Sequence, residues 1–364
     1  MPRHSDRLDQ LHRLLESAHY DAFLISHPAN LSYYTGYSGD SAYLLIGAKR
    51  SCFFTDGRYT TQAADEIPGE IDLIRINSVA DLCRHLRSEN LIRKLGVDET
   101  KMNLGDWLKL REHLDGREPE PAAALINLPR LCKSEDEIER LSKAVKVSET
   151  ALQNTLSRLE TGISEHELAL ELEYQMRRAG AERTAFPLII ASGPRSALPH
   201  GLASPRRLTP GDIVTIDFGA CLQGYHSDQT CTYFLSEPEP EVKQVYNALY
   251  EAQHQGLQAL KGKLLPSPRE LDRTVRKVLL DSGLGEYFSH GTGHGIGLEI
   301  HEAPSISPNS TSETLEIGMV FTIEPGCYFP NRWGIRIEDM IHLGRHGPQK
   351  LTTIDKHLEN MILG

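Results

Sequence analysis

The sequence predicts two domains of different class, an α/β domain over residues 1–125 and an α+β domain over residues 126–364. Three observations support this. Helix-like and strand-like segments alternate in the first third of the chain. Proline and charged residues interrupt every period around residues 115–134. After that point, long helices and hairpin-like strands occur in separate blocks, which is typical of the α+β class. A chain of 364 residues is also long for a single core.

The first domain is predicted to begin with an amphipathic helix around residues 8–15, followed by the short buried strands DAFLIS, AYLLI and SCFF. Helix patterns follow near residues 59–66 and 80–87. In the second domain, Ser134 with Glu137 and Ser164 with Glu167 have the spacing of capping boxes, so each pair predicts the start of a helix. Further helices are predicted over residues 241–259 and 268–282, with strands around them.

Composition excludes several classes of protein. The net charge of -11 and the absence of any lysine or arginine run argue against nucleic acid or an anionic membrane as a partner. No segment approaches the roughly 18 unbroken apolar residues of a membrane span, and the first residues lack a signal-peptide core. We therefore expect a cytoplasmic protein. The cysteines form no CxxC pair and are expected to be reduced packing residues. They are Cys52, Cys83, Cys132, Cys221, Cys231 and Cys327.

One short text occurs twice in the second domain. Residues 211–219 read GDIVTIDFG and residues 318–326 read GMVFTIEPG, with Asp217 and Glu324 at the same place. The alternation of each copy predicts a strand. A second acid follows each copy after a turn-like stretch, Asp228 in the first and Glu338 in the second. If the first hairpin turns near residues 222 and 223, the acids of each copy face each other.

A group of four carboxylates requires positive charge, because burying them unpaired costs several kcal/mol each. Between the two copies lies the run HGTGHGIGLEIHE, which presents His290, His294 and His301. A single acid on a strand is usually solvated, but the duplicated strand, the two return acids and the histidine run together favour a metal site. Oxygen-rich ligands with one imidazole favour Mn, Fe or Co, or Zn in a mixed site. We expect two divalent ions about 3.5–4 Å apart.

The pattern of acids and histidine, with GHGIGLEIHE and IEPG around the later ligands, resembles the pita-bread metallopeptidases. That family includes Xaa-Pro aminopeptidase, prolidase and methionine aminopeptidase. In the first domain, NLSYYTGYSG and FTDGRYTTQA resemble the creatinase-type N-terminal domain of the proline-specific members. The resemblance implies a creatinase-like domain and a pita-bread catalytic domain with pseudo-twofold symmetry, in which the two repeated strands are equivalent. It also implies a homodimer.

The resemblance further implies a role for each metal-site residue. Asp217 would bind one ion in bidentate fashion, Asp228 and Glu338 would bridge both ions, and His294 and Glu324 would complete the other site. Glu324 would also carry a proton from the attacking water to the leaving proline nitrogen. Amide hydrolysis needs each of these functions, since the water must be activated and the amine protonated.

Four more residues match substrate-side positions of the family. His200, in SALPHG, would lie near the scissile bond, His301 would stabilise the tetrahedral oxyanion, and His290 would form a wall of the proline pocket. Arg336 would orient a bridging carboxylate or contact the substrate. The alternatives from the residues alone are packing or loop positions for the histidines and a surface ion pair for the arginine.

Two departures from the family pattern affect the predicted substrate. Cys231, in SDQTCT, stands where the family often has arginine, and Ser305, in HEAPS, stands where dipeptidases often have one. A hydroxyl cannot clamp a free carboxylate as a guanidinium does, although Arg332 or Arg336 could replace that clamp. The sequence therefore favours an Xaa-Pro aminopeptidase acting on peptides with proline second, with prolidase as the alternative. A metal-independent creatinase-like hydrolase and a non-catalytic binding protein are further alternatives.

Overall fold

The computed structural model describes residues 4–48, 50–88, 92–114 and 118–363, and the chain forms two compact units. Unit 1 ends at Arg130 and unit 2 begins at Leu131. The predicted boundary after residue 125 falls inside α6 (Ala123–Asn127), whose carbonyl at Ile126 accepts a hydrogen bond from the Tyr34 hydroxyl. Arg130 likewise donates to Asn30 of unit 1. These bonds keep α6 and the turn after it in unit 1, so the division comes later than expected.

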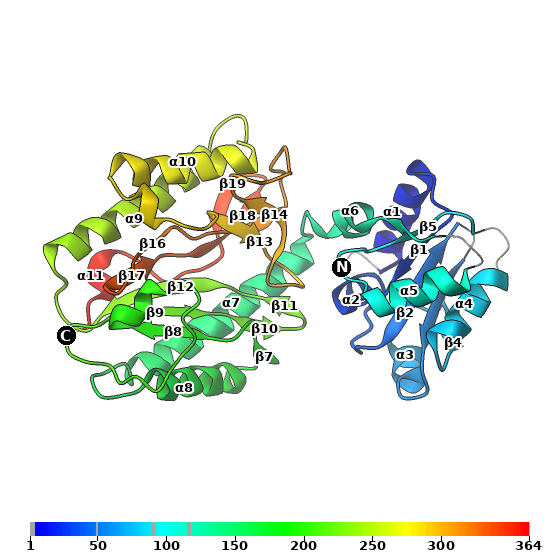
Figure 1. Ribbon diagram of the computed structural model, residues 1–364, viewed down its shortest axis with the longest axis horizontal. Helices are drawn as coiled ribbons and strands as arrows, with labels where there is room; N and C mark the ends of the chain where they lie inside the picture. Colours follow the sequence, from blue (N-terminus) through cyan, green and yellow to red (C-terminus); the bar gives the residue numbers. More distant parts are fainter. Residues whose placement is uncertain (1–3, 49, 89–91, 115–117, 364) are drawn as a thin grey trace. The chain divides into compact units, whose positions relative to one another are not determined.

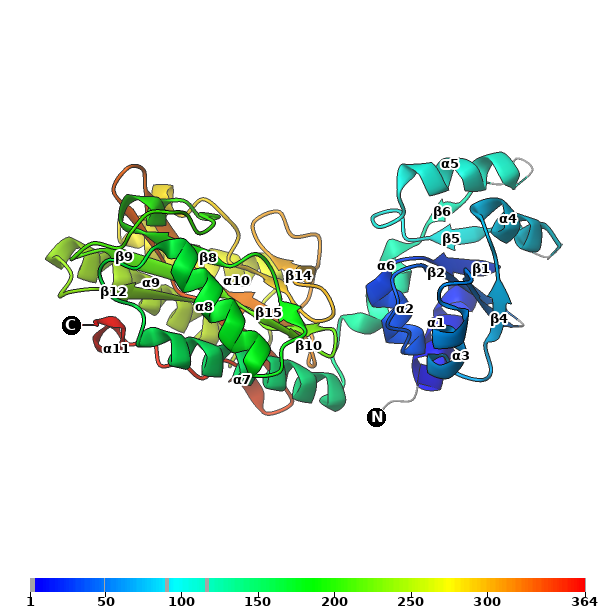
Figure 2. The ribbon, with the colours of Figure 1, turned by 90° about the horizontal axis from the view of Figure 1, so that it is seen from below.

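Unit 1 is built on a mixed sheet with helices packed against it, in the strand order β4-β3-β2-β1-β5-β6 (Figure 1, Figure 2). The strands β1–β2 and β2–β3 are antiparallel, and the other neighbours are parallel. The strands are β1 Ala22–Ile25, β2 Ala42–Gly47, β3 Ser51–Thr55, β4 Asp72–Arg75, β5 Leu95–Val97 and β6 Glu120–Pro121. The helices are α1 His4–Ser17, α2 Pro28–Thr35, α3 Thr60–Glu66, α4 Val79–Ser88, α5 Leu104–His113, α6 and the 3-10 turn η1 Leu128–Arg130.

The predicted elements of unit 1 are present, and the sequence missed the strands β4, β5 and β6 and the helices α2, α5 and α6. Helix α1 buries Leu8, Leu11 and Leu15 at helical spacing, which is the pattern that predicted it. Helix α2 has no such stripe, because Pro28 begins it and its residues are buried around most of its surface. Helix α5 buries mainly Leu110, so its period is weak, although Asn103 caps it.

In unit 2 the strands lie between two pairs of helices, as Figure 1 shows. The helices are α7 Glu135–Leu156, α8 Glu165–Arg178, α9 Pro240–Ala259, α10 Pro268–Asp281 and α11 Leu358–Met361, with the 3-10 turns η2 Gly193–Ala197 and η3 Gly285–Tyr287. The strands of the first half are β7 Arg183–Thr184, β8 Ile189–Ser192, β9 Ile213–Phe218, β10 Ala220–Leu222, β11 Tyr225–His226 and β12 Gln229–Phe234. Those of the second half are β13 Gly293–Gly295, β14 Glu302–Ile306, β15 Val320–Ile323, β16 Gly326–Phe329, β17 Trp333–Arg336, β18 Asp339–Gly344 and β19 Gly347–Lys350.

Both predicted capping boxes are confirmed at the starts of α7 and α8. The Ser134 and Ser164 hydroxyls each accept a hydrogen bond from the backbone N–H three residues later. The side chain of the glutamate at that position accepts in turn from the backbone N–H of the serine. These bonds satisfy backbone donors that would otherwise lack partners. Helices α9 and α10 also begin and end within a residue or two of the predicted bounds. The apolar faces of these helices pack against the sheets that contain the repeated strands.

The repeated text forms equivalent elements in the two halves. Each copy is a strand followed by a hairpin and a returning strand, β9 to β12 in the first half and β15 to β18 in the second. In the second half Ile323 pairs with Asp339 and Gly326 with Arg336, so the ladder sets Glu324 opposite Glu338 as predicted. The duplication is therefore present in the strand topology as well as in the amino-acid sequence.

The predicted register of the first copy is wrong. Asp217 pairs with Thr230 instead of facing Asp228, because the hairpin turns at Gln223 and Gly224, one residue later than expected. Both turn residues have positive φ, 51° and 76°, which glycine adopts readily and which matches the twist of a tight hairpin. A turn shifted by one residue moves the pairing by two. Asp228 is thus a diagonal neighbour of Asp217 on the same face.

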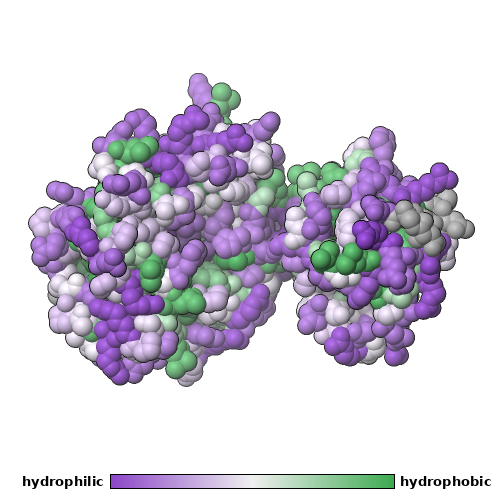
Figure 3. Space-filling view, viewed as in Figure 1, coloured by the Kyte–Doolittle hydropathy of each residue, from purple (hydrophilic) through white to green (hydrophobic). Residues whose placement is uncertain are grey.

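Among the residues that the structure describes, no helix is both long enough and apolar enough to cross a membrane. On the face drawn in Figure 3, the apolar residues of unit 2 form small separate patches within a mainly hydrophilic surface. The apolar side chains instead gather in a core between the helices and the sheets, where Phe218, Phe321 and Ile323 are fully buried. That core lies under the strands that carry the acids.

Candidate metal centre

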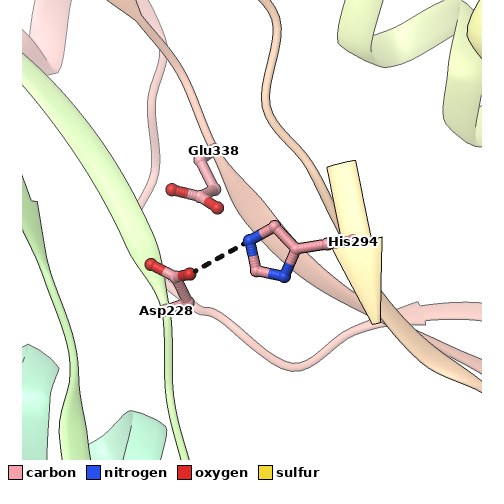
Figure 4. Close-up of side chains that lie close together, drawn as sticks. All are labelled: Asp228, His294 and Glu338. Carbon is pink, nitrogen blue, oxygen red and sulfur yellow. Dashed lines mark ion pairs between the residues drawn. The ribbon is translucent and has the colours of Figure 1, made fainter. Parts of the chain in front are cut away.

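The five predicted ligands lie at the ends of strands that meet in unit 2. Asp217 is in β9, Asp228 directly precedes β12, and His294 is in β13. Glu324 directly follows β15, and Glu338 directly precedes β18. Ligand atoms of Asp228, His294 and Glu338 all lie within 4.8 Å of one another, and their side chains point toward a common centre (Figure 4). Residues more than a hundred positions apart in the sequence thus converge on one point.

The imidazole of His294 is oriented so that one nitrogen is available to a ligand. Its Nδ1 lies 3.0 Å from the carbonyl oxygen of Gly295, which can only accept, so Nδ1 carries the proton. The other ring nitrogen, Nε2, lies 3.5 Å from Oδ2 of Asp228 and 3.6 Å from Oε1 of Glu324. A backbone carbonyl that fixes the tautomer in this way is typical of metal-binding histidines.

Asp217 is held by Arg336 and retains one oxygen without a partner. Nη2 of Arg336 donates to Oδ2 of Asp217 at 2.7 Å, and the arginine side chain is 4% exposed. The other carboxylate oxygen, Oδ1, is buried and makes no hydrogen bond. A buried acceptor without a partner is costly, so this atom marks a place where a cation fits. The alternative of a surface ion pair for Arg336 is therefore wrong, because the pair is buried.

Electrostatics within the cluster favour a bound cation. Burial raises the pKa of Asp228 well above its ordinary range, and the neighbouring Asp217 and Glu324 carboxylates raise it further. Burial, followed by the charge of Asp228, raises the pKa of Glu338 in the same way. Burial also raises the pKa of Glu324. Carboxylates that resist ionisation together become stable anions when divalent charge is supplied, so the donor set fits hard divalent ions.

Two threonines that the sequence analysis did not single out support the carboxylates. Thr230 donates its hydroxyl to Oε2 of Glu338 at 2.8 Å and accepts from Nε of Arg336 at 3.0 Å. The Thr322 hydroxyl lies 3.4 Å from Oε1 of Glu324. Thr230 stands two positions after Asp228, so the two-residue period of a strand places both on one face and could have identified it.

His290 uses both ring nitrogens within the protein. Its Nδ1 donates to the carbonyl of Gly291 at 2.8 Å, and its Nε2 lies 3.0 Å from the hydroxyl of Tyr328. That hydroxyl accepts from Arg336 at 2.8 Å, so it donates its own proton to His290. Burial lowers the pKa of His290 to about 4. The ring is neutral and presents carbon atoms to its surroundings, which suits the wall of an apolar pocket.

The other two predicted histidines lie close to the cluster. The ring centroids of His301 and His294 lie 4.3 Å apart, with an interplanar angle of 75°. Burial and the neighbouring His294 lower the pKa of His301 to about 4. His200 is exposed on the segment after η2, and its charge contributes to the lowered pKa values of both His290 and His301. The three histidines therefore lie near one another and near the cluster, and their catalytic roles stay predictions.

The two departures from the family pattern occupy different environments. Cys231 is buried in β12, where burial raises the pKa of its thiol to about 11, so it is a protonated packing residue. The other cysteines also form no disulfide among the described residues. Ser305 is exposed in β14 and its hydroxyl donates to Ser307 at 3.0 Å. No guanidinium stands at either position.

Comparison with known proteins agrees with this geometry. The family model for metallopeptidase family M24 matches residues 139–345, and that for the creatinase/prolidase N-terminal domain matches residues 7–132. An Xaa-Pro dipeptidase of Pyrococcus horikoshii is 34% identical over 97% of this chain and 99% of its own length.

Two solved structures are also similar. An Xaa-Pro dipeptidase from Bacillus anthracis is 36% identical, with a TM-score of 0.92 over 99% of this chain and 100% of that one. An X-Pro aminopeptidase from Thermotoga maritima is 34% identical, with a TM-score of 0.88 over 98% and 99% of the two chains. The predicted creatinase-like domain and pita-bread catalytic domain are confirmed. The chain belongs to metallopeptidase family M24 and carries an N-terminal domain of the creatinase/prolidase type.

Proposed function

We propose that the protein is a metal-dependent Xaa-Pro dipeptidase, which hydrolyses a dipeptide between its first residue and the proline that follows. The similarity of nearly the whole chain to proteins named Xaa-Pro dipeptidase carries this proposal. The convergence of Asp228, His294 and Glu338 supports the hydrolytic chemistry. The sequence alone favoured an aminopeptidase, and these relatives favour the dipeptidase alternative.

The four carboxylates and the imidazole at the strand ends would hold two divalent ions. Oxygen-rich ligands with one imidazole are compatible with manganese, cobalt, iron or zinc, and manganese is our first candidate. Such ions, when bound, lower the pKa of a water molecule and polarise a carbonyl group. The chain contributes the orientation of its ligands: Arg336 fixes Asp217, and the Gly295 carbonyl fixes His294.

Glu324 is the residue that we assign to proton transfer. Its side chain is 17% exposed, and no arginine or lysine of the described residues lies within ion-pair distance of it. Burial raises the pKa of its carboxyl group, which makes it a better proton acceptor at neutral pH. The carboxylate can therefore take a proton from water and return it to the proline nitrogen when the peptide bond breaks.

The histidines provide the remaining functions. His301 is neutral at neutral pH, so its N–H group can donate a hydrogen bond to the developing oxyanion. His200 is exposed and close enough to influence the pKa of His301, so it can contact the peptide near the scissile bond. The ring of His290, with both nitrogens bonded inside the protein, forms an apolar wall. Such a wall suits the proline ring, whose surface consists of methylene groups.

The dipeptide Gly-Pro and the tripeptide Arg-Pro-Pro test the proposal together. Protein stripped with a chelator and reloaded with Mn²⁺ is expected to hydrolyse Gly-Pro and to leave Arg-Pro-Pro intact. The stripped protein is expected to be inactive, because the water and the carbonyl are no longer activated. Bound metal without turnover of either peptide would contradict the proposal in favour of a non-catalytic binding protein. Full activity after stripping would favour a creatinase-like hydrolase.

An Xaa-Pro aminopeptidase is the second candidate, and one feature of the structure favours it. A dipeptidase needs a cation for the free carboxylate of its substrate, but Ser305 offers only a hydroxyl. Arg332 forms a bidentate pair with Glu241, and Arg336 is buried on Asp217, so neither takes over that clamp. Faster cleavage of Arg-Pro-Pro than of Gly-Pro would assign this activity.

The resemblance to the family also implies a homodimer and a cytoplasmic location, and both remain part of this proposal. Sedimentation of the purified protein measures the first. A monomer at assay concentration would contradict the dimer and would leave the assignment of the metal ligands unchanged, since all five lie in one chain.

A further inference from the structure

We propose that Lys356 is a positioning residue of the metal centre: its buried ammonium group fixes the two strand starts that carry Asp228 and Glu338. The proposal rests on the metal binding argued above and adds a residue outside the ligand set. Lys356 lies in the segment between β19 and α11, 18 positions after Glu338 in the sequence. No motif of the sequence points to it.

Lys356 is buried, with 2% of the residue exposed, and its ammonium group has three acceptors. It donates to the backbone carbonyl of Glu338 at 2.6 Å, to Oδ1 of Asp339 at 2.5 Å and to Oε1 of Gln229 at 3.4 Å. Because an ammonium group has three N–H donors, all three are used. A buried lysine without such partners would be strongly destabilising, so the site is built around this charge.

The three acceptors adjoin the two residues that we expect to bridge the metal ions. One is the peptide carbonyl of Glu338 itself, and Asp339 is the next residue along β18. Gln229 directly follows Asp228 at the start of β12. A fixed peptide group sets the direction of the attached side chain, since side chains leave a strand on alternate faces. Lys356 therefore joins both strand starts from the side opposite the carboxylates.

The lysine is itself held in place at its backbone. Its carbonyl accepts from the hydroxyl of Tyr246 in α9 at 2.9 Å. Upstream, the buried carboxylate of Glu149 in α7 accepts from the backbone N–H groups of Thr353 at 2.6 Å and Ile354 at 3.2 Å. Glu149 also accepts from Gln229 at 3.3 Å. The two helices thus hold the segment in place. Through its ammonium group, the segment in turn fixes the backbone next to Asp228 and Glu338.

Lys350 provides a matched comparison in the same chain. It forms an ion pair with the other carboxylate oxygen of Asp339, at 2.9 Å, but its side chain is 34% exposed. The structure gives it no bond to Glu338 or Gln229. If the pairing of Asp339 alone mattered, both lysines would affect the metal centre. If the fixed strand starts matter, only Lys356 will.

The test is Mn²⁺ titration of the stripped full-length chain, with the free energy of unfolding measured on the same metal-free samples. Lys356→Met is expected to weaken Mn²⁺ binding by about 10- to 100-fold, the range found for residues that orient metal ligands. Lys350→Met is expected to leave binding unchanged within error. Lys356→Arg, which keeps the charge in a different shape, is expected to recover part of the affinity.

Lys356→Met removes one of the two lysines that pair with Asp339, so the variant could fail to fold. A second variant separates that outcome from a loss of metal binding. Lys356→Met with Asp339→Asn removes both charges, and it is expected to fold and still to bind Mn²⁺ weakly. Unchanged Mn²⁺ affinity in either folded variant, or equal losses for Lys350→Met and Lys356→Met, would overturn the role of Lys356. Absence of Mn²⁺ binding by the unsubstituted chain would instead overturn the metal centre and the proposed function with it.

Discussion

The two copies of the repeated strand differ in how firmly each holds its first acid. In the first copy, Asp217 is paired with Arg336 at 2.7 Å. In the second, no arginine or lysine of the described residues forms an ion pair with Glu324, whose Oε1 lies 3.4 Å from the Thr322 hydroxyl and 3.6 Å from Nε2 of His294. A fixed carboxylate suits a permanent ligand, whereas a carboxylate without a cation can exchange a proton. One duplicated element thus supplies two chemical functions.

The turns of the two copies explain a second difference. The first hairpin closes with two residues at Gln223 and Gly224, and its acids are diagonal neighbours. The second closes over residues 330–332, and its acids stand directly opposite each other. Facing and diagonal positions give different separations between side chains on one face. The pseudo-twofold symmetry therefore relates the strands closely and the ligand atoms only approximately.

Each copy also depends on the other. Arg336 of the second hairpin pairs with Asp217 of the first strand, and Thr230 of the first half donates to Glu338 of the second. The Thr232 hydroxyl donates to the carbonyl of Arg336 as well. Neither half could hold its carboxylates in this arrangement alone. Substitutions in one copy are expected to act on both, and their sizes test the comparison.

The largest expected effect comes from Glu324→Gln. The amide cannot accept a proton, so kcat on an Xaa-Pro substrate should fall by about 10²- to 10⁴-fold, the range for a general acid or base. Asp217→Asn should instead lose mainly bound metal, because we assign Asp217 to metal binding and not to proton transfer. Steady-state kinetics with metal analysis measures both. Similar kcat and metal losses in the two variants would remove the difference between the copies.

Arg336→Met comes next, since it leaves a buried carboxylate without its partner. Breaking such a pair costs about 3–5 kcal/mol, and urea unfolding of the metal-free protein should show a loss of that order. The matched control is Arg332→Met, which removes an exposed ion pair with Glu241 and should change the free energy of unfolding little, because solvent screens that pair. Equal costs for the two arginines would mean that Asp217 is not specially held.

The pH dependence of the metal-free protein probes the repulsion between the copies. The folded pKa of Glu338 lies above its unfolded value because of burial and the charge of Asp228. Its stabilising contribution is therefore present at acid pH and is lost as the pH rises through the folded pKa. Glu338→Gln should be more stable than the unsubstituted chain at neutral pH and should lose that advantage in acid. A constant difference in unfolding free energy would contradict the repulsion.

The smallest effect is expected from Thr230→Val, which removes one hydroxyl shared by both copies. Glu338 loses a donor and Arg336 an acceptor, so stability should fall by about 1–3 kcal/mol. Thr274→Val is the control, because that hydroxyl donates only to the backbone of its own helix. Thermal unfolding measures both. Equal shifts for the two threonines would make Thr230 an ordinary packing residue.

Local patterns accounted for much of the fold and for the candidate ligands. The stripe of Leu8, Leu11 and Leu15 predicted α1, and the capping boxes predicted the starts of α7 and α8. The duplicated text indicated which acids belong together. Helices α2 and α5 were missed because neither shows a clear apolar stripe. The first hairpin was placed one residue early, because the positive φ of Gln223 is not visible in its residue type.

The sequence by itself determined which residue types could form a metal site, because repetition and spacing are properties of the text. Only the tertiary structure decided which groups support that site. Arg336 could have been a surface residue, and Lys356 stands in a polar tail with no motif around it. Whether a charge is buried, and against which acceptor, depends on segments that meet only after folding. Contacts between distant segments leave no periodic signal along a single chain.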